Sequence, residues 1–216
     1  DRIGDVVLSL PLATIIKKHF PNSKVSFLLR EYTKPLAENY SDIDEVIVLK
    51  AESGKPKVFE NLPQLKNKFD VCIVAFPTFK IALTLFLSGI KIRIGTGYRW
   101  YSFLFNKKIY EHRKFGERHE LEYNVMLLKH LGIDENISEE NVSFNLHSGD
   151  KSRQFVESEF EKLGIDPRKK IIIVHPGSGG SAVDLPFEKL KNLVELMARE
   201  LDCEILITGS QSEKEL

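Results

Sequence analysis

Short apolar segments alternate with helical segments along the first hundred residues, and this alternation constrains the fold more than any other feature. The run Val71-Cys72-Ile73-Val74-Ala75 is apolar at every position, as a parallel strand must be when helices cover both faces of its sheet. We expect strands at 24–29, 45–49, 70–76 and 91–94, and helices at 5–19, 31–39, 59–69 and 78–88. The pattern predicts the α/β class with a Rossmann-like sheet.

The same pattern restarts near residue 150. A helix at 151–163, a strand at 170–174, a glycine-rich turn, a helix at 186–201 and a strand at 203–207 are expected there. We therefore assign residues 1–149 to a first Rossmann-like domain and residues 150–216 to the beginning of a second. That second stretch, about 65 residues, is shorter than the ~100 residues of a usual domain. The chain also opens on a loop with no strand before it, so we expect a longer natural chain.

Charge and cysteine content exclude several classes of protein. The 31 basic residues balance the 31 acidic ones, which argues against a nucleic-acid-binding protein. Cys72 and Cys203 lie far apart in apolar runs, as reduced core thiols do, which favours a reducing compartment. No apolar stretch reaches the ~18 residues that could span a bilayer. These features predict a cytoplasmic protein.

The first candidate site is the opening segment Arg2-Ile3-Gly4-Asp5-Val6-Val7-Leu8-Ser9-Leu10-Pro11. Glycine permits a tight turn, and Asp5 follows it at the start of a helix. In an open α/β sheet, loops of this kind lie where ligands bind. Asp5 could simply cap the helix. Alternatively, it could act as a general base that removes a proton from a sugar hydroxyl.

The second candidate site is the glycine-rich turn between a predicted strand and a predicted helix. Such a turn can present backbone N–H groups and hydroxyls to a phosphate, aided by the positive end of the following helix. The spacing matches neither the Walker pattern nor G-x-G-x-x-G. An ordinary flexible loop is the alternative. The residues of this turn that could contact the phosphate are Gly177, Ser178, Gly179, Gly180 and Ser181.

The third candidate is a long segment, about residues 95–114, that is rich in aromatic and basic side chains. Cations beside exposed rings suit an anionic glycolipid at a membrane surface, and a packed loop whose rings belong to the core is the alternative. Arg99 and Arg113 are the predicted contacts to such a glycolipid within it. The cluster comprises Arg93, Arg99, Trp100, Tyr101, Phe103, Phe105, Lys107, Lys108, His112, Arg113 and Lys114.

The tripeptide Asp42-Ile43-Asp44 has the form of a D-x-D metal motif. It immediately precedes the strand predicted at 45–49, which favours a solvated turn. The histidines also lack the spacing of metal ligands. We therefore predict no metal site.

Three segments together resemble glycosyltransferase family 9, the heptosyltransferases. The opening segment from Arg2 to Pro11 is similar to the family's first motif, and His175-Pro176-Gly177-Ser178-Gly179-Gly180-Ser181 is similar to its second. Between them, His119-Glu120-Leu121-Glu122-Tyr123-Asn124 resembles an H-x-x-E-x-N stretch of the family. The matches occur in the family's order and span nearly the whole chain.

The resemblance implies a GT-B fold, in which two Rossmann-like domains face each other across a cleft. It implies transfer of heptose from an ADP-activated donor to inner-core lipopolysaccharide, with inversion and without a metal or cofactor. Asp5 takes the role of catalytic base, and Arg2 and Gly4 join Arg99 and Arg113 as acceptor contacts. A peripheral position at the inner face of the cytoplasmic membrane follows from the glycolipid acceptor. No nucleic-acid partner is expected.

One segment departs from the family pattern. Many members carry a basic residue shortly before a Trp-Pro pair, whereas this chain has Val183-Asp184-Leu185-Pro186. A cation there would stabilise charge on the leaving phosphate. Two other functions therefore stay open: a nucleotide-sugar epimerase of the same architecture, and a noncatalytic protein that binds carbohydrate or nucleotide.

Overall fold

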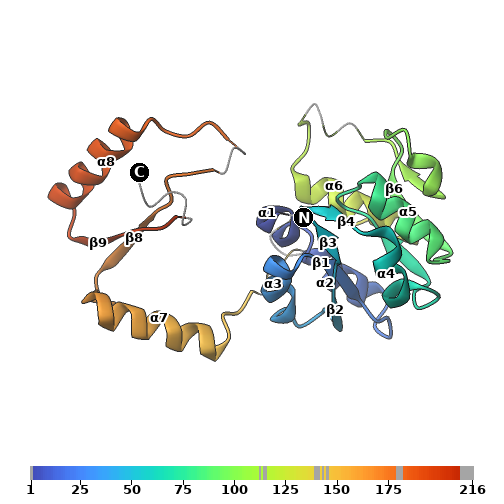
Figure 1. Cartoon of the computed structure of the whole chain (residues 1–216), viewed down its shortest axis with the longest axis horizontal. Helices are drawn as coiled ribbons and strands as arrows, with labels where there is room; N and C mark the ends of the chain where they lie inside the picture. Colours follow the sequence, from blue (N-terminus) through green and yellow to red (C-terminus); the bar gives the residue numbers. More distant parts are fainter. Residues whose placement is uncertain are drawn as a thin grey trace. The chain divides into compact units, whose positions relative to one another are not determined.

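The computed structural model describes residues 2–111, 113, 116–138, 142, 144, 146–178 and 182–209. The chain divides into two compact units, which comprise Asp1–His147 and Ser148–Leu216 (Figure 1). Each unit is described by itself.

Helices and parallel strands alternate along the first unit. Its elements are α1 (Ile3–Val7), α2 (Pro11–His19), β1 (Ser26–Leu29), η1 (Glu31–Thr33), α3 (Lys34–Glu38), β2 (Glu45–Val48), β3 (Ala51–Glu52), β4 (Lys55–Pro56), α4 (Val58–Leu65), β5 (Val71–Ile73), α5 (Phe79–Leu87), β6 (Ile92–Thr96), η2 (Ser102–Leu104), β7 (Lys107–Ile109), α6 (Glu120–Met126) and η4 (Leu127–Leu131).

The helix predicted at 5–19 is two helices, α1 and α2. Pro11 begins α2, because a proline ring fits the first turn of a helix but breaks the hydrogen bonding of its interior. The segment predicted to be irregular, 95–114, contains η2 and the short strand β7.

The strands of the first unit form two parallel groups and one short antiparallel pair, β3–β4. β1 pairs with β2, and β6 lies between β5 and β7. In the doubly wound order 3-2-1-4-5-6, strands 3-2 and strands 4-5-6 flank strand 1. The pair β2-β1 and the triplet β5-β6-β7 correspond to these two flanking groups in chain order. Among the described residues, the Rossmann-like sheet that we expected is therefore seen as these two parallel groups, with the β3–β4 hairpin separate from both.

Three apolar clusters hold the first unit together. One packs α4 and α5 against β2 and β5 around Phe105 and Ile90. A second surrounds Leu10 and Tyr40 and includes residues of α1, α2, β1 and α3. The third joins α2 to α6 and η4, with Leu128 fully buried. Helices α1 and α6 are thereby fixed to the same body of the protein.

Gly95 in β6 and Gly97 just after it both face aromatic rings. A Cβ atom at Gly95 would lie 2.8 Å from the ring of Phe105, which is 1% exposed. A Cβ atom at Gly97 would meet the ring of Tyr110, which is 62% exposed and packs edge-on against Tyr98 near the surface. The two positions therefore differ in how well the neighbouring ring can yield.

We expect Gly95→Ala to destabilise the protein by about 2 kcal/mol, because the buried Phe105 ring cannot move aside. Gly97→Ala should cost less than about 0.5 kcal/mol. In thermal unfolding, the first change should lower Tm by about 6 °C and the second by about 1 °C. Equal losses of Tm would show that the Phe105 packing does not restrict Gly95.

The Asp42–Asp44 turn, in which Asp44 is exposed, is also held by internal contacts. Asp42 accepts a hydrogen bond of 2.5 Å from the Thr14 hydroxyl. Asp44 pairs with Lys17 at 2.7 Å and accepts the Val25 backbone N–H at 2.6 Å. The hydrogen bond from Lys17, followed by the one from Val25, lowers the pKa of Asp44. Both carboxylates are thus engaged in fixing the turn to α2 and the start of β1.

The two cysteines are free thiols, as predicted. Burial in β5 raises the pKa of Cys72 to about 12. At neutral pH this thiol is therefore almost entirely protonated and a poor nucleophile.

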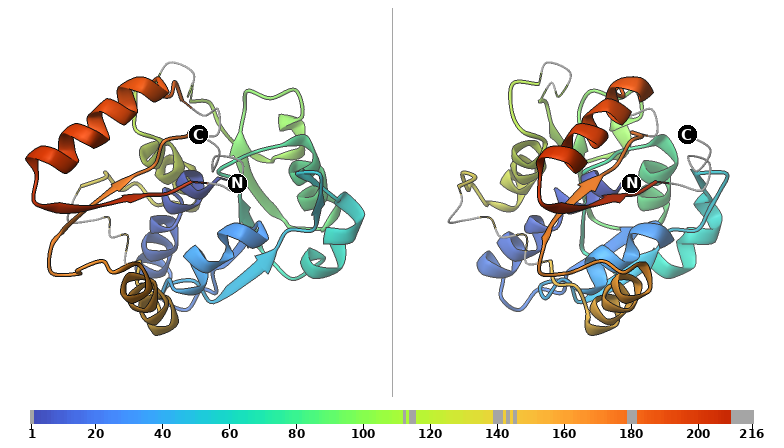
Figure 2. Two further views of the ribbon diagram at one scale, coloured as in Figure 1. Left: turned by 60° about the vertical axis from the view of Figure 1, so that its left-hand side comes forward. Right: turned by 90° about the vertical axis from the view of Figure 1, so that its left-hand side faces the viewer.

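The second unit contains α7 (Asp150–Leu163), β8 (Lys170–Val174), α8 (Phe187–Glu200) and β9 (Cys203–Ile207). β8 and β9 are parallel, and Lys170 lies opposite Cys203 and Val174 opposite Ile207. Helix α8 runs beside this strand pair in both views of Figure 2. The glycine-rich turn follows the carboxyl end of β8, as the sequence predicts.

Among the helices that the structure describes, none combines the length and the apolar character needed to cross a bilayer.

Candidate active site

Asp5 lies in the first turn of α1, a helix anchored by apolar residues. Val6 and Leu10 are buried on its inner side, while Arg2 and Gly4 are exposed. The carboxylate of Asp5 is half-buried and accepts a long hydrogen bond, 3.3 Å, from the Arg2 backbone N–H. It therefore caps the helix, as one of the two interpretations predicts. A hydrogen bond of that length leaves the carboxylate able to accept another donor.

Asn124 connects α6 to the turn that ends α1. Its side chain is 2% exposed. The amide donates to the Leu8 carbonyl at 3.1 Å and to the Ser9 hydroxyl at 3.4 Å. The Ser9 hydroxyl in turn donates to the Asp5 carbonyl at 2.7 Å. This buried amide therefore fixes the backbone of the helix that carries Asp5.

The H-x-x-E-x-N stretch is explained by two local roles. The Glu122 carboxylate accepts the His119 backbone N–H at 2.6 Å, and the His119 ring accepts the Leu121 N–H at 3.3 Å. These contacts form a cap at the start of α6. Two residues after Glu122, Asn124 faces inward. Sequence reasoning recognised the motif but not the role of Asn124, because its partners at residues 8 and 9 are distant in sequence.

Arg113 uses its guanidinium within the first unit. It forms an ion pair with Glu120 and donates to the Asn124 side-chain oxygen at 3.3 Å. The guanidinium also lies 5.6 Å from the ring centroid of Tyr123. The predicted acceptor contact at this position would therefore have to share the guanidinium with these partners.

Some side chains of the aromatic and basic segment are packed in the core, and others are exposed as a glycolipid contact would require. Tyr101 and Phe105 are buried in the core, whereas Trp100 and Phe103 are exposed. Arg93 is anchored by the carbonyls of Ile90 and Leu104 and stacks on Phe86. Arg99, by contrast, is exposed. Residues 112 and 114, also predicted in this cluster, lie outside the described residues.

The described part of the glycine-rich turn is organised by Asp184. The Ser178 backbone N–H donates to the Asp184 carboxylate at 2.8 Å, and the Ser178 hydroxyl donates to the Ala182 carbonyl at 3.0 Å. His175 lies within 3.0 Å of the Thr208 hydroxyl at the end of β9. Of the predicted donor contacts, Gly177 and Ser178 are described, and 179–181 lie outside the described residues.

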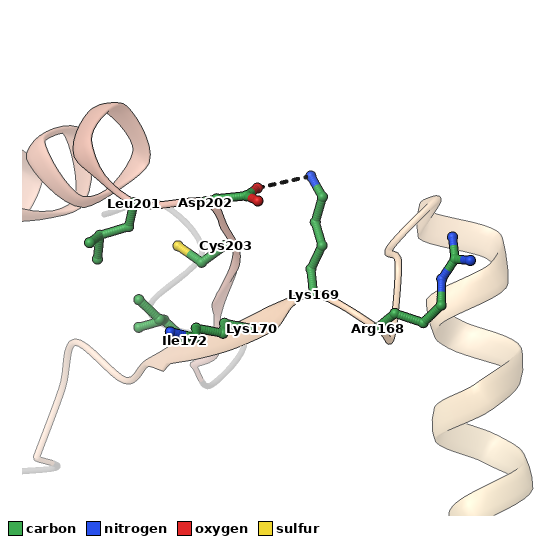
Figure 3. Close-up of a pocket in the computed structure, with 7 residues that line it drawn as sticks. All are labelled: Arg168, Lys169, Lys170, Ile172, Leu201, Asp202 and Cys203. Carbon is green, nitrogen blue, oxygen red and sulfur yellow. Dashed lines mark ion pairs between the residues drawn. The ribbon is translucent and has the colours of Figure 1, made fainter.

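A shallow pocket elsewhere in the second unit lies at the amino ends of β8 and β9 (Figure 3). Lys169 points toward Asp202 across it, while Arg168 points away toward α7. Ligands in open parallel sheets bind at the carboxyl ends of the strands. This pocket is therefore distinct from the glycine-rich turn, which follows the opposite end of β8.

The solved structures that resemble this chain place it in the GT-B class of α/β folds. A glycosyltransferase family 9 protein from Veillonella parvula has a TM-score of 0.80 and 19% identity, and the match covers 100% of this chain and 62% of that one. An Escherichia coli heptosyltransferase solved with ADP has a TM-score of 0.71 and 17% identity, and the match covers 100% of this chain and 66% of that one.

Residues 59–216 match glycosyltransferase family 9 (heptosyltransferase), and the chain belongs to this family. A Haemophilus influenzae protein whose name marks it only as a candidate glycosyltransferase is 29% identical over 100% of this chain and 63% of its own length. Lipopolysaccharide heptosyltransferase 3 of Escherichia coli is 22% identical over 80% of this chain and 51% of its own length.

The chain thus spans between about half and two thirds of the length of these relatives. The predicted α/β class, the GT-B type of fold and the family are confirmed. The placement of two domains across a cleft and the roles of the individual site residues stay predictions.

Proposed function

We propose that the protein transfers heptose or a related sugar from an ADP-activated donor to inner-core lipopolysaccharide or a similar anionic glycolipid. The observation that carries this proposal is the half-buried Asp5 carboxylate on a short helix fixed by Asn124. Membership of family 9 and the Escherichia coli relative solved with ADP support the reaction type and the nucleotide.

The proposed reaction is a single displacement. Asp5 accepts the proton of an acceptor hydroxyl while the hydroxyl oxygen attacks the anomeric carbon of the donor sugar. The bond between that carbon and the diphosphate breaks, and ADP leaves with the electron pair. Attack from the face opposite the leaving group inverts the anomeric centre. The step uses no metal or cofactor.

The donor diphosphate is assigned to the turn formed by residues 177–181. A turn between a parallel strand and a helix presents backbone N–H groups to phosphate oxygens. Acceptor contacts are assigned to Arg2, Gly4, Arg99 and Arg113 in the first unit. Because the acceptor is a glycolipid, we place the protein in the cytoplasm, in peripheral contact with the inner face of the membrane.

A direct test is to incubate the full-length protein with ADP-heptose and a truncated core acceptor, and to follow product by mass spectrometry. Calorimetric titration with ADP-, UDP- and GDP-sugars would identify the nucleotide. Transfer together with selective binding of the ADP-sugar would support the proposal. Donor epimerised without acceptor would identify an epimerase, and donor bound without any turnover would identify a noncatalytic binding protein.

Asp184 places a negative charge at the turn to which we assign the donor diphosphate. We expect Asp184→Asn to lower the Kd for ADP about fivefold, because two like charges near 4 Å repel by about 1 kcal/mol in water. The asparagine oxygen can still accept the Ser178 N–H, so the turn should keep its shape. The gain in affinity for ADP should become smaller as salt is added, because salt screens the repulsion.

Calorimetry with ADP at low and high salt measures this effect. Asp202→Asn, which removes an exposed carboxylate at the amino end of β9, is the matched control and should leave the Kd unchanged. Weaker binding in Asp184→Asn would show that the carboxylate orders the turn for the donor rather than repelling it.

A further inference from the structure

An exposed aromatic pair stands beyond the carboxyl ends of β5 and β6. Phe79 begins α5, which follows β5, and Trp100 lies in the turn after β6. The two ring centroids are 4.7 Å apart, and the ring planes are inclined by 30°. The Trp100 side chain is nevertheless 72% exposed. The outward part of this ring pair is therefore accessible to a ligand.

The pair is held by the residues beneath it. Tyr101 is buried, contacts both rings at centroid distances of 5.5 and 6.0 Å, and donates its hydroxyl to the Pro77 carbonyl at 2.8 Å. The buried Ser102 hydroxyl donates to the Thr96 carbonyl at 2.6 Å. The turn that carries Trp100 is therefore fixed on both sides. A ligand would meet a preformed surface and would not have to order it.

Arg99 adds a cation directly beside the indole. Its backbone N–H donates to the Ser102 hydroxyl at 3.0 Å, which fixes the main chain. Its side chain is exposed, and no residue of the described ranges forms an ion pair or hydrogen bond with the guanidinium. In this respect Arg99 differs from Arg93 and Arg113, whose guanidinium groups are engaged internally.

We infer that Trp100 and Phe79 form a stacking surface for an acidic sugar ring of the acceptor, with Arg99 binding its carboxylate or phosphate. One face of a pyranose ring presents C–H groups with partial positive charge, which suit the negative face of an aromatic ring. A guanidinium matches a carboxylate or phosphate in charge and shape. This inference rests on the proposed function, because it assigns the surface to the acceptor of that reaction.

The composition of the surface favours a single sugar over a lipid bilayer. Attraction to an anionic membrane is worth about 1 kcal/mol per basic residue and needs a cluster of them. Beside the ring pair, Lys80 and Arg99 are the basic residues adjacent in sequence. The rings also stack on each other and are anchored by Tyr101.

Trp100 is the only tryptophan of this sequence, so the difference in tryptophan emission between the unaltered protein and Trp100→Phe reports on this surface. We would titrate the protein, without donor, with methyl glucuronide, with methyl glucoside, and with vesicles of phosphatidylglycerol and phosphatidylcholine. We expect a saturable emission change with the glucuronide and protection of the indole from acrylamide quenching. The neutral glucoside should bind about fivefold more weakly, because it lacks the charge for Arg99.

Three variants separate the contributions. Arg99→Gln should weaken glucuronide binding about fivefold and leave glucoside binding unchanged. Phe79→Leu should weaken the binding of both sugars. Phe59→Leu, which alters an exposed ring on α4, should change neither.

An emission change with vesicles alone would overturn the inference in favour of a membrane contact, and a failure of both sugars to change the emission would overturn it outright. If Arg99→Gln bound the glucuronide as tightly as the unaltered protein does, Arg99 would not bind the acidic group of the sugar. In the transfer assay, Trp100→Leu should raise the acceptor KM at unchanged kcat. Glucuronide binding without any transfer would refute the proposed function alone, while transfer with an unchanged acceptor KM in Trp100→Leu would refute the stacking surface alone.

Discussion

Asp5→Asn should reduce kcat for sugar transfer by about a thousandfold, because an amide cannot accept the proton of the attacking hydroxyl. This loss corresponds to about 4 kcal/mol of transition-state stabilisation. The asparagine keeps the size of the side chain and can still accept the Arg2 N–H. Stability and the Kd for ADP should therefore stay unchanged. Initial rates of transfer at saturating donor and acceptor measure the effect.

Two further variants make this result specific. Asp150→Asn removes the acidic residue from the first turn of α7 and should leave kcat unchanged. Asp5→Glu keeps a carboxylate and should recover part of the lost activity. If Asp5→Asn retained the kcat of the unaltered protein, Asp5 would be a helix cap and nothing more.

Asn124→Leu should both destabilise the protein and impair transfer. The leucine fills the site but leaves the Leu8 carbonyl and one Arg113 N–H without their partner. Each buried polar group left without a partner costs about 1 to 3 kcal/mol. We expect the free energy of unfolding to fall by about 3 kcal/mol in total, with Tm lower by about 9 °C. At temperatures where the variant is folded, kcat should still be about tenfold lower, because α1 is no longer fixed.

Asn61 provides the matched control in the same unit. It is fully buried in α4, and its side chain bonds the backbone of Lys50 and Lys57. Asn61→Leu should lower Tm by a similar amount without changing kcat below that Tm. Equal kcat losses in the two variants would show that Asn124 acts only through global stability.

Much of the first unit could be predicted from periodicity, because strand and helix periods differ over a few residues. The apolar run 71–75 and the stop at Gly89 placed β5 and α5 within a few residues. β7 was missed because Lys107 and Lys108 give it no apolar alternation, and only its pairing with β6 defines it as a strand. The hairpin β3–β4 was also missed, although Ser53 and Gly54, both at positive φ, form its turn.

The candidate site was only partly predictable, because several of its contacts join residues distant in sequence. The motif around Asp5 was visible, but the amide that fixes its helix comes from residue 124. From the sequence, the segment Val183-Asp184 differs from the family pattern by lacking a basic residue. The structure shows in addition that this segment contacts the glycine-rich turn, because the Ser178 backbone N–H donates to the Asp184 carboxylate. The sequence shows which residue types are present, but it does not show which carboxylate accepts a hydrogen bond from which backbone N–H.

We propose that Asp5 and the turn after β8 serve the same reaction, Asp5 on the acceptor and the turn on the donor. The most direct test is an experimental structure of the full-length protein with ADP and a core acceptor. We predict an Asp5 carboxylate oxygen within hydrogen-bonding distance, about 3 Å, of an acceptor hydroxyl, with the ADP diphosphate against residues 177–181. An Asp5 carboxylate turned away from the bound acceptor, or a diphosphate held elsewhere, would contradict this account.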